Sequence, residues 1–145
     1  MFFRSMKISD TSRVVELFRQ VGRSEFPVPS RWWFATRLLL PTFHVFVLED
    51  EKHQVVGAAV LNRLPNPKYN WCGHIDYVVI DKPFRGRGFG RKLMVGTIAR
   101  ARALGCREVL LSTSTPEARA LYHSLGFQVL SSSSSMKLSP QTHCS

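Results

Sequence analysis

A glycine-rich turn, Arg85-Gly86-Arg87-Gly88-Phe89-Gly90, sharply narrows the possible folds of this chain. It follows an apolar run at 78–80 that is typical of a buried strand, and it precedes apolar residues at helical spacing over 93–104. The first N–H groups of a helix have no intrahelical partner, and the helix dipole adds partial positive charge there. Glycines let the backbone approach a ligand closely. The turn therefore predicts a cradle for a pyrophosphate. Four basic side chains could add positive charge to it: Arg85, Arg87, Arg91 and Lys92.

Other phosphate-binding motifs do not match this turn. The Gly-Lys-Ser/Thr ending of a P-loop is absent, and the spacing is G-x-G-x-G, not the G-x-G-x-x-G of dinucleotide-binding folds. The turn also comes late in the chain, after three or four expected strands, not in a first strand–helix–strand unit. A tight turn with a purely structural role is the alternative interpretation.

The remaining pattern predicts strands and helices in a mixed order. The expected strands cover 1–9, 43–48, 55–61, 71–80, 109–111, 127–130 and 136–138, and the expected helices lie around 14–21, 31–40, 93–104 and 118–125. Asp10 or Thr11 is expected to cap the first helix and Gly22 to end it, and Ser114 or Thr115 to cap the last. Pro65 is expected to begin a loop. The order β-α-α-β-β-β-α-β-α-β-β predicts an α/β domain with a mixed sheet over 1–138, followed by a polar tail at 139–145.

Size and cysteine content predict a soluble cytoplasmic protein of one domain. The chain has 145 residues, and its longest apolar run, Val55–Leu61, falls short of the ~18 residues that span a bilayer. The N-terminus shows no signal-peptide pattern. Cys72, Cys106 and Cys144 are too scattered for a disulfide framework, and no cluster has metal-ligand spacing, so reduced thiols and no metal are expected.

Positive charge is the unusual bulk property. Lys and Arg number 20 against 10 Asp and Glu, which gives a formal net charge of +10. The excess lies in residues 1–40 and from Arg85 onward. A basic field attracts anions and repels cationic small molecules, so an anionic partner is expected, with charge for solubility as the alternative.

Two segments resemble the GNAT N-acetyltransferases. Residues 78–94 resemble motif A of that family, and Thr115-Pro116-Glu117-Ala118 through Tyr122 to Gly126-Phe127 resembles its motif B, N-x-x-A-x-x-x-Y-x-x-x-G-F. The resemblance covers roughly residues 55–130 well, although Thr115 stands where Asn is common. It implies one GNAT-type domain, with a mostly antiparallel splayed sheet of six to seven strands flanked by about four helices. It also implies acetyl-CoA as cosubstrate, bound by Val78, Val79, Ile80, Arg85, Gly86, Arg87, Gly88, Phe89, Gly90, Arg91, Lys92 and Thr115.

Three side chains are candidates for proton transfer. By resemblance, Tyr122 would protonate the departing sulfur, and its alternative role is a core aromatic. His74 and Asp76 are two apart on one expected strand, so they share a face, and either could take the proton of the amine. An imidazole has the more suitable ordinary pKa for this task. A carboxylate would need burial to raise its pKa, or it could act through its charge. Tyr77 is expected to point to the opposite face as packing, and Cys72 to be a bystander.

The acceptor is predicted from a subgroup resemblance and from charge. Residues 85–96, 99–107 and 122–128 resemble the actin-type N-terminal acetyltransferases, whose acceptor is acidic, and a net charge of +10 suits such a peptide. A lysine or small-molecule acetyltransferase is one alternative. A non-catalytic acyl-CoA- or nucleic-acid-binding domain is another, with Arg31-Trp32-Trp33-Phe34 stacking on bases, although no nucleic-acid-binding signature is present. No membrane partner is expected.

Overall fold

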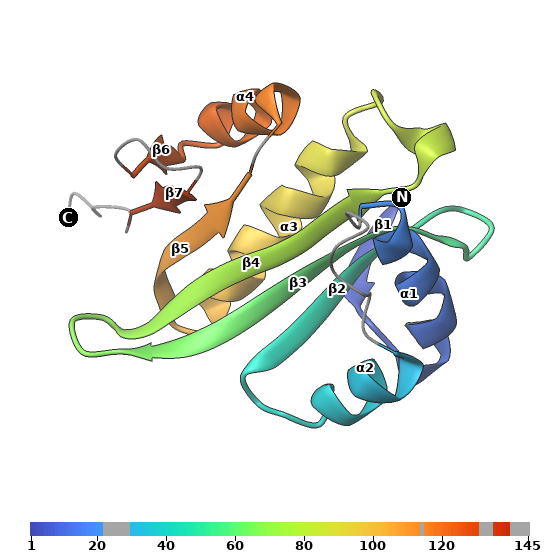
Figure 1. Cartoon of the computed structure of the whole chain (residues 1–145), viewed down its shortest axis with the longest axis horizontal. Coiled ribbons are helices and arrows are strands. Elements are labelled where there is room, and N and C mark those ends of the chain that lie inside the picture. Colours follow the sequence, from blue (N-terminus) through green and yellow to red (C-terminus); the bar gives the residue numbers. More distant parts are fainter. Residues whose placement is uncertain (22–29, 114, 131–134, 140–145) are drawn as a thin grey trace.

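The computed structural model describes residues 1–21, 30–113, 115–130 and 135–139 (Figure 1). These residues form one sheet in the order β1-β2-β3-β4-β5-β7-β6. Its strands are β1 (Phe2–Ser5), β2 (Phe43–Glu49), β3 (Val55–Asn66), β4 (Asn70–Ile80), β5 (Cys106–Ser112), β6 (Gln128–Val129) and β7 (Ser135–Leu138). The helices are α1 (Thr11–Arg19), α2 (Arg31–Arg37), α3 (Phe89–Ala103) and α4 (Pro116–Ser124), with short 3-10 turns at Ile8–Asp10 and Lys82–Phe84.

The predicted fold class and element order are confirmed. All strand pairs are antiparallel except β4 with β5, which is parallel because α3 crosses between them. The predicted loop is present but begins after Asn66, two residues later than expected. Pro65 and Asn66 remain in register with Trp71 and Asn70, and the Asn66 side chain closes the hairpin by accepting the N–H groups of residues 68 and 69. The first strand is also shorter than predicted, since a 3-10 turn begins at Ile8.

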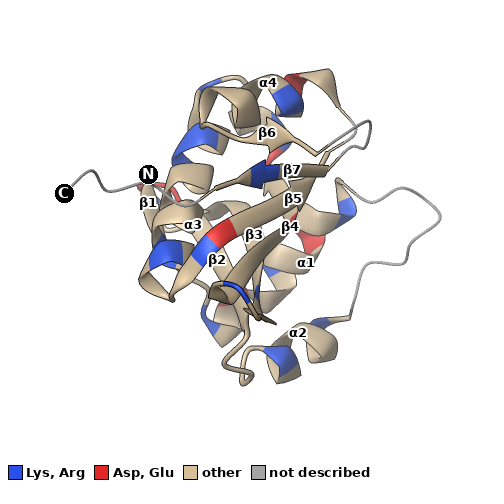
Figure 2. Cartoon of the chain, turned by 90° about the vertical axis from the view of Figure 1, so that its left-hand side faces the viewer, with Lys and Arg blue, Asp and Glu red and all other residues tan. Residues whose placement is uncertain are grey.

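Helices cover both faces of the sheet. α1 and α2 pack on one face, and their Val14, Phe18 and Phe34 share a buried cluster with β2 and β3 residues. α3 packs on the other face, and α4 lies beside it over β5 (Figure 1). Lys and Arg residues occur in α2, α3 and α4, and therefore in helices on both sides of the sheet (Figure 2). Among the described helices, none is long and apolar enough to span a membrane.

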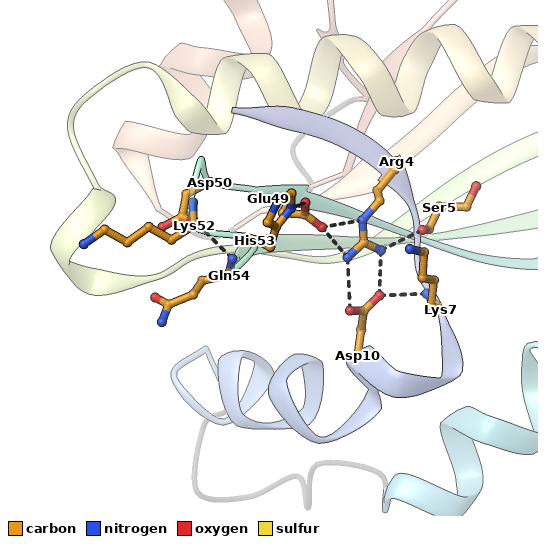
Figure 3. Close-up of polar contacts among 9 residues, drawn as sticks. All are labelled: Arg4, Ser5, Lys7, Asp10, Glu49, Asp50, Lys52, His53 and Gln54. Carbon is orange, nitrogen blue, oxygen red and sulfur yellow. Dashed lines mark hydrogen bonds and ion pairs between the residues drawn. The ribbon is translucent and has the colours of Figure 1, made fainter.

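An ion-pair network holds the N-terminal strand (Figure 3). The guanidinium of Arg4 contacts the carboxylates of Asp10 at 2.7 Å and Glu49 at 2.6 Å, and His53 Nδ1 lies 2.7 Å from Glu49. Contacts from His53 and Arg4 lower the pKa of Glu49. Asp10 occupies the predicted cap position of α1, but its carboxylate binds Arg4 and the N–H of Lys7 instead of the helix. Gly22, which was predicted to end this helix, lies outside the described residues.

The sheet opens between β4 and β5. These strands pair from Trp71 with Cys106 to Ile75 with Leu111, and β5 then ends at Ser112 while β4 runs on to Ile80 (Figure 1). Beyond Ile75, the edge of β4 that faces β5 has no strand partner among the described residues. Backbone N–H and C=O groups in such a gap need partners, so the opening is suited to a ligand that carries amides. The chain after β7, from 140 to 145, lies outside the described residues.

Candidate active site

The glycine-rich turn forms an open cradle at the start of α3. Gly86 and Gly88 adopt φ of 75° and 81°, a left-handed conformation that side chains rarely tolerate. A Cβ built at either position would meet nothing within 4 Å, so the space in front of the turn is free. Gly88 is the N-cap of α3, and its carbonyl accepts the N–H of Lys92. The first-turn N–H groups of α3 therefore face an open space that fits a pyrophosphate.

The fold orients three of the four predicted phosphate-binding cations. Arg85 donates from Nη2 to Gln20 Oε1 at 3.3 Å, Arg91 donates to Ser124 Oγ at 2.7 Å, and Lys92 donates to the Met1 carbonyl at 2.5 Å. The guanidinium of Arg87 lies 5.8 Å from the centre of the Phe84 ring. All four side chains belong to exposed residues, so the cradle has positive charge on its rim.

A second set of contacts fastens the cradle to α1. Asp81, which directly follows β4, accepts from Gln20 Nε2 at 2.8 Å and pairs with Arg13 at 2.5 Å. Burial raises the pKa of Asp81, but the bonds from Gln20 and Arg13 outweigh it, and the pKa is lowered. Gln20 thus joins Asp81 to Arg85. Sequence reasoning missed Gln20 and Asp81 as part of the site, because their contacts span 61 positions.

The three β4 residues predicted to bind acetyl-CoA lie on the part of β4 beyond its pairing with β5. Val78 and Ile80 pack toward α3, and Val79 packs toward α1. The Ile80 carbonyl is already engaged, since it accepts Arg85 Nε at 2.8 Å. The cradle and the free edge of β4 together fit an acyl-CoA: the first for its pyrophosphate, the second for its amide-bearing arm.

His74 and Asp76 lie where the sheet opens. Ile75, between them in sequence, is the last β4 residue paired with β5. The expected shared face is confirmed, since His74 Nδ1 lies 3.0 Å from Asp76 Oδ1. The other carboxylate oxygen of Asp76 accepts Asn62 Nδ2 at 2.7 Å. Both side chains are about one-third exposed, at 34% and 36%, so the pair is held in place and still reaches solvent.

The predicted orientation of Tyr77 is wrong. A bulge places Asp76 opposite Val60 and Val78 opposite Ala59, so Tyr77 has no residue opposite it on β3. Its φ of 49° is unusual for a bulky residue and turns the side chain toward α1, where its ring lies 5.5 Å from that of Phe18. Tyr77 therefore lines the same pocket as Asp76.

This pocket, called the aromatic pocket below, has a volume of about 250 Å³. It combines residues from α2, β2, β3 and β4. The lining residues are Trp33, Phe34, Phe43, Val60, Asn62, Asp76 and Tyr77. Ser30 caps α2 by accepting the N–H of Trp33, which fixes the helix turn that presents the Trp33 ring.

Tyr122 lies on α4, on the other side of the sheet from the aromatic pocket. It is buried among residues that include Met94 and Leu111, and its ring centre is 5.8 Å from that of Phe127. Burial raises the pKa of Tyr122, so its hydroxyl stays protonated and can donate a proton. No described contact joins it to His74 or Asp76, and the three candidates therefore lie on two faces of the sheet.

Other predicted residues have structural roles. Thr115 caps α4 by accepting the N–H of Ala118 at 3.4 Å, so its hydroxyl serves the helix, and Ser114 lies outside the described residues. Cys72 is buried, and burial raises the pKa of its thiol, as expected of a bystander. Within the described ranges, no group of three or more His, Cys, Asp or Glu is placed to hold a metal ion.

An open sheet that splays beside a glycine cradle at a helix N-terminus fits the binding of an acyl-CoA. The profile of the acetyltransferase (GNAT) family matches residues 11–127. This chain belongs to that family.

Several curated proteins match part of the chain. It is 41% identical over 75 residues to mouse N-alpha-acetyltransferase 80, covering 52% of this chain and 23% of the mouse protein. It is 33% identical over 86 residues to rice glucosamine 6-phosphate N-acetyltransferase 1, covering 57% of this chain and 52% of the rice protein. It is 36% identical over 82 residues to Arabidopsis thaliana N-alpha-acetyltransferase MAK3, covering 55% of this chain and 43% of the Arabidopsis protein. The matches therefore span about half or less of these relatives.

Solved structures share the fold over nearly the whole chain. A putative acetyltransferase from Agrobacterium tumefaciens has a TM-score of 0.80 at 28% identity, covering 91% of this chain and 96% of that one. A phosphinothricin acetyltransferase from Sinorhizobium meliloti, solved with acetyl-CoA, has a TM-score of 0.79 at 21% identity, covering 98% of this chain and 94% of that one.

Proposed function

We propose that this protein transfers the acetyl group of acetyl-CoA to an amine. The observation that carries the proposal is the opening between β4 and β5, which has the glycine cradle at one end and Asp76 at its start. When bound, acetyl-CoA supplies a thioester whose carbonyl is electrophilic and whose sulfur is a good leaving group. Family membership supports the same chemistry.

Each candidate residue has a role that follows from its position. The first-turn N–H groups of α3 and the rim cations bind the pyrophosphate, and the free edge of β4 binds the amides of the arm. Asp76 accepts the proton of the attacking amine, because it lies at the opening and also lines the aromatic pocket. His74 and Asn62 hold its carboxylate. Tyr122, kept protonated by burial, donates a proton to the departing sulfur.

Separate variants of Asp76 and His74 distinguish the base from its partner. We expect Asp76→Asn to lower kcat by about 100-fold, within the range for loss of a general base. His74→Ala is expected to lower kcat only a few-fold, because it removes a partner of the Asp76 carboxylate and not the base itself. A loss of about 100-fold in His74→Ala, with only a few-fold loss in Asp76→Asn, would exchange the two roles.

We propose further that the acceptor is the N-terminal amine of a protein or peptide with an acidic N-terminal segment. Two of the relatives are N-alpha-acetyltransferases. The formal net charge of +10 favours an acidic chain, and Arg37 adds a local cation, since its guanidinium lies 5.3 Å from the centre of the Trp33 ring. The rice relative suggests glucosamine 6-phosphate as the alternative acceptor, but the described residues that line the aromatic pocket include no Lys or Arg to pair with a phosphate.

Competing acceptors at two salt concentrations test this proposal. Peptides with an acidic N-terminal segment are expected to have a higher kcat/KM than Lys-rich peptides of equal length. This preference should shrink as salt rises, because exposed charges are screened beyond about 10 Å at 0.1 M. Glucosamine 6-phosphate and a polyamine serve as the other acceptors. Faster transfer to Lys-rich peptides, to the polyamine or to the sugar phosphate at low salt would contradict it.

A further inference from the structure

The aromatic pocket is lined by apolar and aromatic side chains apart from the hydrogen-bonded pair Asn62 and Asp76. Phe34 and Phe43 form its base and are 2% and 7% exposed, whereas Trp33 and Tyr77 form its rim at 39% and 47%. The Trp33 ring meets Phe34 and Phe43 edge to face, with centres 5.3 and 5.6 Å apart. At about 250 Å³, the pocket is smaller than the roughly 300–1,000 Å³ of sites for drug-sized ligands. Its size suits one side chain.

Two observations indicate that this pocket binds a ligand and is not a packing defect. Large aromatic side chains such as Trp33 and Tyr77 are usually more buried than these are, and both rings border the same cavity. Tyr77 also keeps a backbone φ of 49°, a costly conformation for a bulky residue that persists only where the surrounding structure holds it. The bulge that creates this strain directly follows Asp76 and places the ring at the rim.

The position of Asp76 decides what enters the pocket. A base must come within hydrogen-bond reach of the amine or act through one water. In a peptide, the Cα next to that amine also carries the first side chain, so this side chain must lie within a few ångströms of Asp76. The aromatic pocket is lined by Asp76 itself. Resting on the proposed transfer to a peptide N-terminus, we infer that the aromatic pocket receives the side chain of the acceptor's first residue and selects an apolar, uncharged one.

The charges around the aromatic pocket indicate that the acidic residues of the acceptor bind outside it. Among the described residues that line this space, Asp76 carries the one carboxylate, and none is a Lys or Arg that could pair with an acidic first side chain. Such a side chain would lose water and meet a like charge. Arg37 stacks on Trp33 from outside the lining, where it can meet a residue further along the peptide. The acceptor class is therefore an apolar first residue followed by acidic residues.

Peptides that differ only at the first position test the inference. One series begins with Leu, Met, Asp or Lys and continues with the same acidic residues. The wild-type protein is expected to show a kcat/KM at least about 10-fold higher for Leu or Met than for Asp, as apolar pockets typically discriminate. Trp33→Ala is expected to reduce that ratio several-fold, and Trp33→Phe to restore most of it. Trp33→Arg, which adds a cation at the rim, should shift the preference toward Asp.

Trp32→Ala is the matched control, since Trp32 is 78% exposed on the same helix and does not line the aromatic pocket. It should leave the ratio unchanged, and thermal melting checks that each variant is folded. If Asp-first peptides match or exceed Leu-first peptides, or if Trp33→Ala leaves the ratio unchanged, the inference fails while transfer to peptides stands. If glucosamine 6-phosphate alone is acetylated, the proposed acceptor fails and the inference with it.

Discussion

Gly88→Glu is expected to weaken acetyl-CoA binding by at least about 100-fold and to leave the fold intact. The new carboxylate would stand at the N-cap of α3, in the open space assigned to the pyrophosphate, and like charges there oppose binding. The left-handed backbone at φ 81° adds a strain of roughly 1–2 kcal/mol to any side chain, which lowers the melting temperature modestly. Isothermal titration calorimetry measures the affinity, and circular dichroism follows the fold.

Gly88→Gln separates charge from strain, because it introduces a side chain of nearly the same size in the same backbone conformation. We expect Gly88→Gln to melt like Gly88→Glu but to keep more of the affinity. Equal losses in the two variants would assign the effect to backbone shape instead of charge. Unchanged affinity in Gly88→Glu would remove the pyrophosphate cradle from this turn.

Tyr122→Phe is expected to lower kcat by about 100-fold with acetyl-CoA affinity nearly unchanged. The substitution removes only a hydroxyl, so the packing of the ring against Phe127 is retained. General acids contribute roughly 10²–10⁴-fold when they protonate a leaving group. Burial raises the pKa of Tyr122, so loss of its proton should reduce the rate only above about pH 10, the ordinary value for tyrosine.

Tyr69→Phe provides the same chemical change at a distance. Tyr69 lies in the β3–β4 hairpin, at the opposite end of β4 from the opening (Figure 1). The kcat of the Tyr69→Phe variant should equal that of the wild-type protein. An unchanged kcat in Tyr122→Phe would make Tyr122 a structural residue, and a matching loss of acetyl-CoA affinity would place the effect in binding.

Local sequence was enough to predict the glycine turn at the start of α3 and the element order. A turn with glycines at 86, 88 and 90 ahead of a helical pattern depends only on the backbone freedom of glycine and on helix ends, which are short-range properties. Thr115 and Pro116 mark the start of α4 for the same reason. The fold class followed because the spacing of apolar residues reports which elements can form. The shared face of His74 and Asp76 also followed, from the two-residue period of a strand.

Tertiary structure decided what surrounds Asp76. The bulge at Tyr77 depends on how β4 aligns with β3, and a shift of one residue reverses the side that a residue faces, which is why its predicted orientation was wrong. Asn62 meets Asp76 only because these strands pair antiparallel, and Gln20 reaches Asp81 across 61 positions. The aromatic pocket needs α2, β2, β3 and β4 at once. Contacts of this kind arise from packing and register between distant segments, and residue spacing along the chain does not encode them.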